Sequence, residues 1–89
     1  MNVEQSVRIL NKNGLHARPA AEMVKAAAKF KSDITISRED IEVNGKSIMG
    51  VMMLAAECGS EIMLRATGPD AQEAVSALAS LVAGRFGES

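Results

Sequence analysis

The chain has 89 residues, and 10 Lys and Arg side chains nearly balance 11 Asp and Glu. This length predicts a single domain over residues 1–89, and the balanced charge argues against nucleic acid or an anionic membrane surface as a partner. With one cysteine, Cys58, and one histidine, His16, the sequence offers no disulfide and no metal-ligand set, so we expect no metal and no cofactor. No signal peptide and no apolar stretch of ~20 residues is found, which favours a cytoplasmic protein without membrane insertion.

The first two predicted elements are a strand and an amphipathic helix. Apolar alternation predicts a strand from about Val3 to Leu10, and the turn-forming residues 11–14 end it. Proline is tolerated only in the first turn of a helix, so Pro19 places the start of the following helix close to His16. The apolar stripe of this helix recurs at three- and four-residue steps and comprises Ala20, Met23, Val24, Ala27 and Phe30.

The middle of the chain predicts a hairpin followed by a short helix. Ile34 and Ile36 alternate with polar residues, the polar turn at 38–40 follows, and a third strand then continues through residues 41–43. Residues 46–54 are apolar on every side after Ser47, a residue type that caps helix N-termini. We therefore expect a short helix on the surface of the sheet.

The last two predicted elements are a fourth strand and a long helix. Residues 62–67 alternate in hydrophobicity, and Gly68 with Pro69 ends the strand. The spacing of Asp70 and Glu73 predicts a capping box, and the helical stripe that follows extends through Phe86. The whole order, βαββαβα, predicts an α+β fold. Because each strand has one apolar face, we expect a four-stranded, mainly antiparallel sheet with all three helices on one face.

The single histidine lies where a turn meets a helix. Such a histidine is more often a surface or capping residue than a reactive one, so its neighbours carry the functional hypothesis. The backbone amides near Ala17 and Arg18 belong to a helix N-terminus, which attracts anions, and the Arg18 guanidinium matches phosphate oxygens. Gly14 gives the preceding turn conformations closed to other residues. These features predict an anion site with a nucleophilic imidazole at its centre.

The same segment lacks the remaining parts of a complete enzyme. No second acid or base accompanies His16 in the motif, and the sequence contains no glycine-rich loop that would hold a nucleotide. A nucleophile beside an anion cradle suits a group carrier that depends on its partners for the rest of the catalytic machinery. We therefore predict a phosphoryl carrier that is not a stand-alone catalyst.

Two segments carry a family resemblance. GLHARPA at residues 14–20 resembles the active-site signature of the histidine-containing phosphocarrier (HPr) family of the bacterial phosphoenolpyruvate-dependent sugar phosphotransferase system, and KSIMG at 46–50 resembles the family's second signature. The resemblance covers essentially the whole chain. It implies an open-faced β-sandwich in which His16 accepts a phosphoryl group on Nδ1 from enzyme I and passes it to enzyme IIA proteins. It also implies that Arg18 steadies the phosphate.

The resemblance also implies a regulatory site and a docking surface. Ser47 matches the serine that HPr kinase/phosphorylase modifies in many bacteria, although a plain helix cap explains this residue equally well. We expect Val51 and Leu54 to be core residues and the protein to be a monomer. The residues expected to meet partners lie on the first two helices and are Ala21, Lys25, Ala28, Ile48, Met49 and Met52.

Three alternatives remain open at this point. A related branch of the family serves nitrogen-related regulation instead of sugar uptake, although the 46–50 segment favours the sugar-type or kinase-regulated branch. An acylphosphatase-like hydrolase has a similar size, but no arginine-bearing phosphate loop follows the first predicted strand. A ferredoxin-like domain that binds a small regulatory molecule would make His16 incidental.

Overall fold

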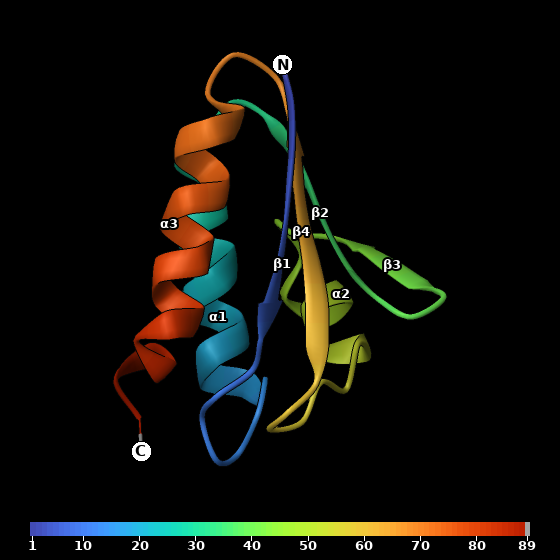
Figure 1. The fold of residues 1–89 in the computed structure, drawn as a ribbon, viewed down its shortest axis with the longest axis vertical. Helices are drawn as coiled ribbons and strands as arrows, with labels where there is room; N and C mark the ends of the chain where they lie inside the picture. The colour runs from blue at the N-terminus through green and yellow to red at the C-terminus, as the bar shows by residue number, and fades with distance from the viewer. Residues whose placement is uncertain (89) are drawn as a thin grey trace.

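The computed structural model describes residues 1–88 and confirms the predicted order of elements (Figure 1). Along the chain these are β1 (Asn2–Arg8), α1 (Ala17–Ala27), β2 (Asp33–Arg38), β3 (Ile41–Asn44), α2 (Ile48–Met53), β4 (Glu61–Thr67) and α3 (Ala71–Ala83). A short 3-10 helix, η1 (Arg85–Gly87), follows α3. The fold is the predicted α+β open-faced sandwich.

The sheet is antiparallel throughout and has the strand order β1-β4-β2-β3. The central strand β4 is flanked by β1 and β2, and Leu64 lies opposite Gln5 on one side and Ile36 on the other. Buried and less buried residues alternate along most of the two central strands, as expected for a sheet that is covered on one face. These buried residues are Ile34, Ile36, Ile62, Leu64 and Ala66.

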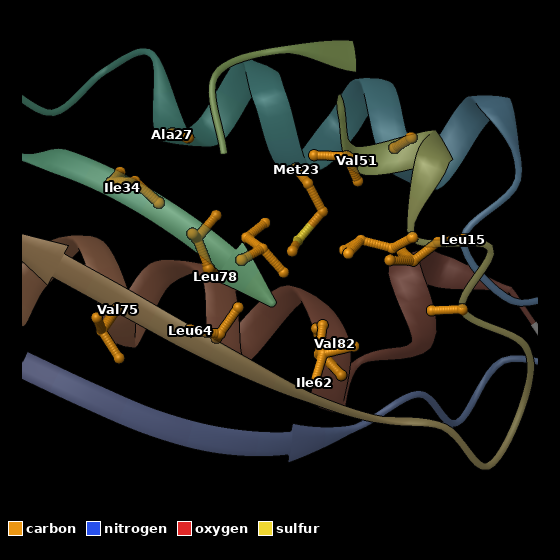
Figure 2. Packing of buried hydrophobic residues seen from close by; sticks show 14 of the residues in the cluster. Leu15, Met23, Ala27, Ile34, Val51, Ile62, Leu64, Val75, Leu78 and Val82 are labelled. Carbon is orange, nitrogen blue, oxygen red and sulfur yellow. The ribbon is translucent and has the colours of Figure 1, made fainter. Parts of the chain in front are cut away.

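The helices complete the core on that face of the sheet. The third helix packs along β1 and β4, α2 packs beside β3, and α1 contacts both other helices. Figure 2 shows Met23 of α1 extending toward the sheet, with Val51 of α2 beside it, and both belong to the same buried cluster as Leu78 of α3 and the strand residue Leu64. Val51 and Leu54 are fully buried, which confirms both as core residues. The core therefore fixes the position of α1, whose N-terminus carries His16.

Several predicted boundaries were wrong. The first strand ends at Arg8, although Ile9 still exchanges two backbone hydrogen bonds of 2.8 Å with residues 59 and 60. Helix α1 ends at Ala27, so Phe30 lies beyond it. Helix α3 ends at Ala83, and Phe86 reaches the core from a left-handed backbone conformation, with φ of 53°, instead of from the helical stripe.

The predicted capping box at the start of α3 was also wrong. Asp70 occupies the N-cap position, but its side chain makes no capping hydrogen bond. Its carboxylate instead accepts hydrogen bonds from the backbone amides of Lys31 and Ser32, at 2.8 and 2.9 Å, and from the Ser32 hydroxyl at 2.6 Å. Three donors that precede β2 therefore compete successfully with the local amides of α3. The result is a clamp between the start of β2 and the start of α3.

This clamp predicts a pH-dependent contribution to stability. The Ser32 hydroxyl, followed by the amide of Lys31, lowers the pKa of Asp70 from 3.8 to about 2. A carboxyl whose folded-state pKa is depressed stabilises the fold above its unfolded-state pKa, and this contribution disappears as the pH falls through the folded-state value. We expect Asp70→Asn to be less stable than wild type in urea at pH 7, and the difference to shrink between about pH 4 and pH 2. A difference that stays constant over this range would contradict the role of the ionised carboxylate.

Candidate functional site

His16 lies at the N-cap position of α1, immediately before the first helical residue. Its backbone is extended, with φ of −75° and ψ of −174°, and its carbonyl accepts the first helical hydrogen bond from the amide of Ala20 at 3.0 Å. The side chain makes no capping hydrogen bond and remains 40% exposed. The preceding residue, Leu15, is buried and points into the core (Figure 2). The imidazole is therefore presented to solvent from an anchored backbone.

The turn before His16 requires a glycine. Gly14 has a φ of +66°, a left-handed conformation that is unfavourable for other residues. Its amide donates to the carbonyl of Asn11 at 3.1 Å, and the next amide, that of Leu15, donates to the carbonyl of Ala56 at 2.8 Å. A Cβ atom at position 14 would clash with this same carbonyl oxygen and would lie 2.8 Å from the Cα of Glu57. The close approach of the two loops therefore fixes where α1 begins.

The first turn of α1 contains the residues that the sequence predicts to bind an anion. Ala17 and Arg18 are its first two residues, and helix geometry leaves amides at these positions without partners inside the helix. Pro19 has no N–H, so its presence in the first turn removes no hydrogen bond. Both amides and the positive end of the helix dipole lie next to the imidazole in the chain. The structure thus brings together all three residues that the sequence predicts for the centre of the site.

The Arg18 side chain crosses to the segment that follows α3. Its Nη2 atom donates to the carbonyl of Phe86 at 2.7 Å and lies 2.8 Å from Oε2 of Glu88. Its Nε atom lies 3.2 Å from the same oxygen, and Nη1 lies 3.1 Å from Oε1 of Glu22 one turn along α1. The hydrogen bond to Glu88 is the main reason that the pKa of Arg18 is raised. Carboxylates therefore hold the guanidinium beside the imidazole.

The Glu88 side chain contacts His16, Arg18 and Asn11 at the centre of the site. Its Oε2 atom lies 2.8 Å from Nε2 of His16, and its Oε1 atom accepts a hydrogen bond of 2.9 Å from Nδ2 of the buried Asn11. The Glu88 side chain is only 19% exposed. Hydrogen bonds from Arg18, then from Asn11 and His16, lower the pKa of Glu88 from 4.5 to about 2, so the carboxylate is ionised at neutral pH.

Sequence reasoning missed Glu88 and Asn11. Glu88 is separated from His16 by 72 residues and from Asn11 by 77, and no motif surrounds it. Asn11 belongs to the predicted turn at residues 11–14, but turn chemistry alone does not predict its contact with Glu88. Its Nδ2 atom also donates to the carbonyl of Gly14 at 2.7 Å, so it links the turn to the carboxylate.

Ser47 is the N-cap residue of α2, as predicted. Its hydroxyl oxygen accepts a hydrogen bond from the amide of Gly50 at 3.1 Å, and the side chain is partly exposed. Among the apolar residues near it, Ile48 is 45% exposed, Met49 76% and Met52 42%. Met53, which was not among the predicted docking residues, is 69% exposed. The short helix therefore covers the core with one side and leaves an apolar surface on the other.

The predicted docking residues of the first helix share one face by their spacing but differ in exposure. Ala21 is half-buried, whereas Lys25 and Ala28 are exposed, and Ala28 is the C-cap residue. Lys25 lines an open groove of about 340 Å³ between α1 and α3, together with Leu81 of α3. Helix α1 also contacts α2, which carries the predicted apolar docking residues. The structure thus places Lys25 beside α3.

The described residues contain neither a membrane-spanning helix nor a cluster of metal-ligating side chains. Within residues 1–88, no helix combines the length and the hydrophobicity that crossing a bilayer requires. Over the same residues, His, Cys, Asp and Glu side chains form no group of three or more that could hold a metal ion. Cys58 is exposed and belongs to no such group.

Comparisons with known proteins place this fold and site. A family model described as "PTS HPr component phosphorylation site" matches residues 3–84. The phosphocarrier protein HPr of Treponema pallidum is 52% identical over 97% of this chain and 98% of its own length, and that of Cupriavidus necator is 50% identical over 97% of each. A crystal structure of HPr-C-His from Thermoanaerobacter tengcongensis superimposes with a TM-score of 0.94, at 46% identity and 98% coverage of both chains.

Two further relatives show the breadth of the group. The HPr-like protein Crh of Bacillus subtilis is 48% identical over 90% of this chain and 94% of its own length. A structure described as an HPr dimer from Thermoanaerobacter tengcongensis superimposes with a TM-score of 0.79, at 48% identity, over 92% of this chain and 94% of that chain.

The fold and the site therefore define a small phosphocarrier protein, a class that carries phosphoryl groups and is not a stand-alone catalyst. The chain belongs to the HPr family of the phosphotransferase system. Membership in this family argues against both the acylphosphatase-like hydrolase and the ferredoxin-like regulatory domain that the sequence left open.

Proposed function

We propose that His16 accepts a phosphoryl group from phosphorylated enzyme I and delivers it to enzyme IIA proteins for sugar uptake. The observation that carries this proposal is the arrangement of the imidazole itself. It is partly exposed at the start of α1, and its Nε2 atom contacts an ionised carboxylate. An ionised carboxylate only accepts hydrogen bonds, so this contact favours a hydrogen on Nε2 and leaves the lone pair on Nδ1.

The proposed reaction moves one phosphoryl group between nitrogen atoms. The Nδ1 lone pair of His16 forms a bond to phosphorus while the bond between phosphorus and the donor nitrogen of enzyme I breaks, and the electron pair of that bond returns to the donor. Delivery to enzyme IIA reverses these roles. Because no water takes part, the site needs positioning and charge stabilisation rather than a general base.

Arg18 and the amide of Ala17 are the groups that we propose to stabilise the phosphoryl oxygens. A guanidinium donates two parallel hydrogen bonds to phosphate, and a helix N-terminus favours negative charge. In the unphosphorylated protein Arg18 is held by Glu22 and Glu88. The incoming phosphoryl oxygens therefore have to compete with these carboxylates for the N–H groups of the guanidinium.

We propose that partners dock on the exposed apolar surface of α2 and on the neighbouring part of α1. Ile48, Met49 and Met52 form an apolar surface beside the Ser47 cap, and methionine adapts its shape to different partners. The small side chains Ala21 and Ala28 permit close approach of a partner helix. Lys25 would meet an acidic partner surface beside α3.

The transfer itself is tested by reconstitution. The purified protein is incubated with phosphoenolpyruvate, Mg²⁺ and catalytic enzyme I, and an enzyme IIA protein is then added. We expect one acid-labile phosphoryl group per chain, which moves to IIA. Parallel reactions with the enzyme I of the nitrogen-related branch distinguish the two branches, because faster charging by that donor would overturn the assignment to sugar uptake.

Regulation at Ser47 gives a separate prediction. A phosphoryl group on the N-cap would favour the N-terminus of α2 but would place roughly two negative charges beside the apolar docking surface. We expect Ser47→Asp to remain folded and to accept phosphoryl groups from enzyme I at least several-fold more slowly than wild type. Ser47→Asn, which keeps a capping side chain without the charge, is the matched control and should transfer at nearly the wild-type rate. Equal rates for the two variants would contradict the proposal that Ser47 lies on the docking surface.

We further propose that the protein works as a monomer in the cytoplasm, where enzyme I and HPr kinase/phosphorylase would meet it. The charged outer face of the sheet supports the monomer, because Arg65 on that face pairs with Glu4 at 2.6 Å and with Glu42 at 3.2 Å. Sedimentation at micromolar concentration should give the mass of a single chain, and a dimeric mass would overturn this part of the proposal.

A further inference from the structure

The Glu88 carboxylate makes contacts that a surface glutamate does not ordinarily make. One oxygen, Oε2, lies 2.8 Å both from Nε2 of His16 and from Nη2 of Arg18, and the other accepts from Nδ2 of Asn11 at 2.9 Å. Three side chains from the β1–α1 turn and the first turn of α1 therefore contact one carboxylate, and that carboxylate belongs to the last residue that the structure describes. In the proposed transfer this carboxylate favours a hydrogen on Nε2 and holds Arg18 in the resting protein, which leaves open what it does while phosphorus bonds to Nδ1.

The segment that delivers Glu88 has an unusual backbone. Arg85, Phe86 and Gly87 all have positive φ values, of 56°, 53° and 75°, and for the two residues that are not glycine this conformation is uncommon and costly. Phe86 compensates by burying its ring, which is 4% exposed, and its carbonyl accepts the 2.7 Å hydrogen bond from Arg18. The tight turn after α3 is therefore held in place from both sides and aims Glu88 at the imidazole.

The consequence for the imidazole follows from hydrogen-bonding chemistry. Glu88 is ionised at neutral pH, so its contact with Nε2 requires a hydrogen on that nitrogen. When Nδ1 of a neutral imidazole forms a bond to phosphorus, the ring becomes an imidazolium with positive charge shared by Nε2. A carboxylate at Nε2–H stabilises this charge, as the aspartate does for the histidine of a Ser-His-Asp triad.

We propose that Glu88 is a positioning residue, which holds His16 in the Nε2–H tautomer and stabilises the positive charge that the ring acquires while Nδ1 takes the phosphoryl group. The kinetic half of this inference rests on the proposed carrier function, whereas the tautomer is a property of the resting protein. The two can therefore fail separately.

The tautomer is measured by ¹⁵N NMR of the imidazole in unphosphorylated protein at a pH where the ring is neutral. In wild type we expect a protonated Nε2 and an unprotonated Nδ1. Glu88→Ala should show a mixture of the two tautomers, and Glu88→Gln, whose amide oxygen can still accept a hydrogen bond, should lie between them. The control Glu39→Gln removes one exposed carboxylate in the β2–β3 turn and should leave the ring unchanged. A wild-type ring protonated on Nδ1, or a Glu88→Ala spectrum identical to wild type, would overturn the proposal.

The kinetic half is measured as the initial rate of phosphoryl acceptance from enzyme I, with backbone NMR spectra confirming that each variant is folded. Partners that orient a metal-ligating histidine contribute about 10- to 100-fold to affinity or activity, and the same scale sets the expectation for Glu88. We expect a loss of about 10-fold or more in Glu88→Ala, a smaller loss in Glu88→Gln and none in Glu39→Gln. A Glu88→Ala rate equal to wild type would overturn the kinetic role. A wild-type protein that accepts no phosphoryl group would instead refute the proposed function and leave the tautomer result to stand on its own.

Discussion

We expect that replacing His16 with alanine abolishes phosphoryl acceptance from enzyme I. The reason is that no other imidazole exists in the chain, so no second nitrogen nucleophile of this kind can take over. The expected loss exceeds the detection range of the assay, at least 10³-fold, because the nucleophile itself is removed. Phosphoenolpyruvate labelled in its phosphoryl group, with Mg²⁺ and enzyme I, provides the measurement, and the label is counted after gel separation.

The fold of this variant should survive, because the His16 side chain makes no capping hydrogen bond and is 40% exposed. A backbone NMR spectrum that retains the dispersion of wild type is the necessary control. Lys12→Ala serves as a matched variant, because Lys12 is an exposed residue of the same turn and should leave labelling intact. Persistent acid-labile label on folded His16→Ala would contradict the assignment of His16 as the acceptor.

Replacing Met23 with alanine should cause the largest loss of stability among the predicted changes. Met23 is fully buried between α1 and the core residues Leu78 and Val51 (Figure 2), so truncation leaves a cavity that the sheet and helices cannot fill without moving. Truncations of this kind cost about 2–5 kcal/mol, a large share of the ~5–15 kcal/mol that stabilises a typical domain. Urea unfolding at pH 7 measures the free energy of unfolding directly.

The chain contains its own control for this experiment. Met49 is the same residue type, also helical, but 76% exposed. Met49→Ala should change the free energy of unfolding by no more than about 0.5 kcal/mol. Equal destabilisation by the two substitutions would mean that Met23 does not belong to the core that positions α1.

Local sequence patterns predicted most of the fold. Alternation identified Ile34, Ile36 and Leu64 as buried strand residues, and the proline rule placed the start of α1 within a residue of its position. These predictions were right because each depends on periodicity or on backbone chemistry that acts within a few residues. The same reasoning correctly identified His16 and Arg18 as neighbours at a helix N-terminus.

The errors arose where distant groups compete with local ones. Asp70 had the right spacing for a capping box, but amides and a hydroxyl at residues 31 and 32 took its carboxylate. Phe86 continued the helical period of α3, yet the backbone turns left-handed after Gly84. No pattern in the sequence indicates that Glu88 would reach His16 across 72 residues, because that contact is created by tertiary structure.

The central claim is that Nδ1 of His16 carries the phosphoryl group, and the most direct test is NMR of the protein labelled with ¹⁵N and charged by phosphoenolpyruvate and enzyme I. We expect one phosphorus nucleus coupled to Nδ1 of the single imidazole, with Nε2 still bearing its hydrogen. Phosphorus bonded to Nε2, or found on a hydroxyl while the imidazole remains free, would contradict the claim.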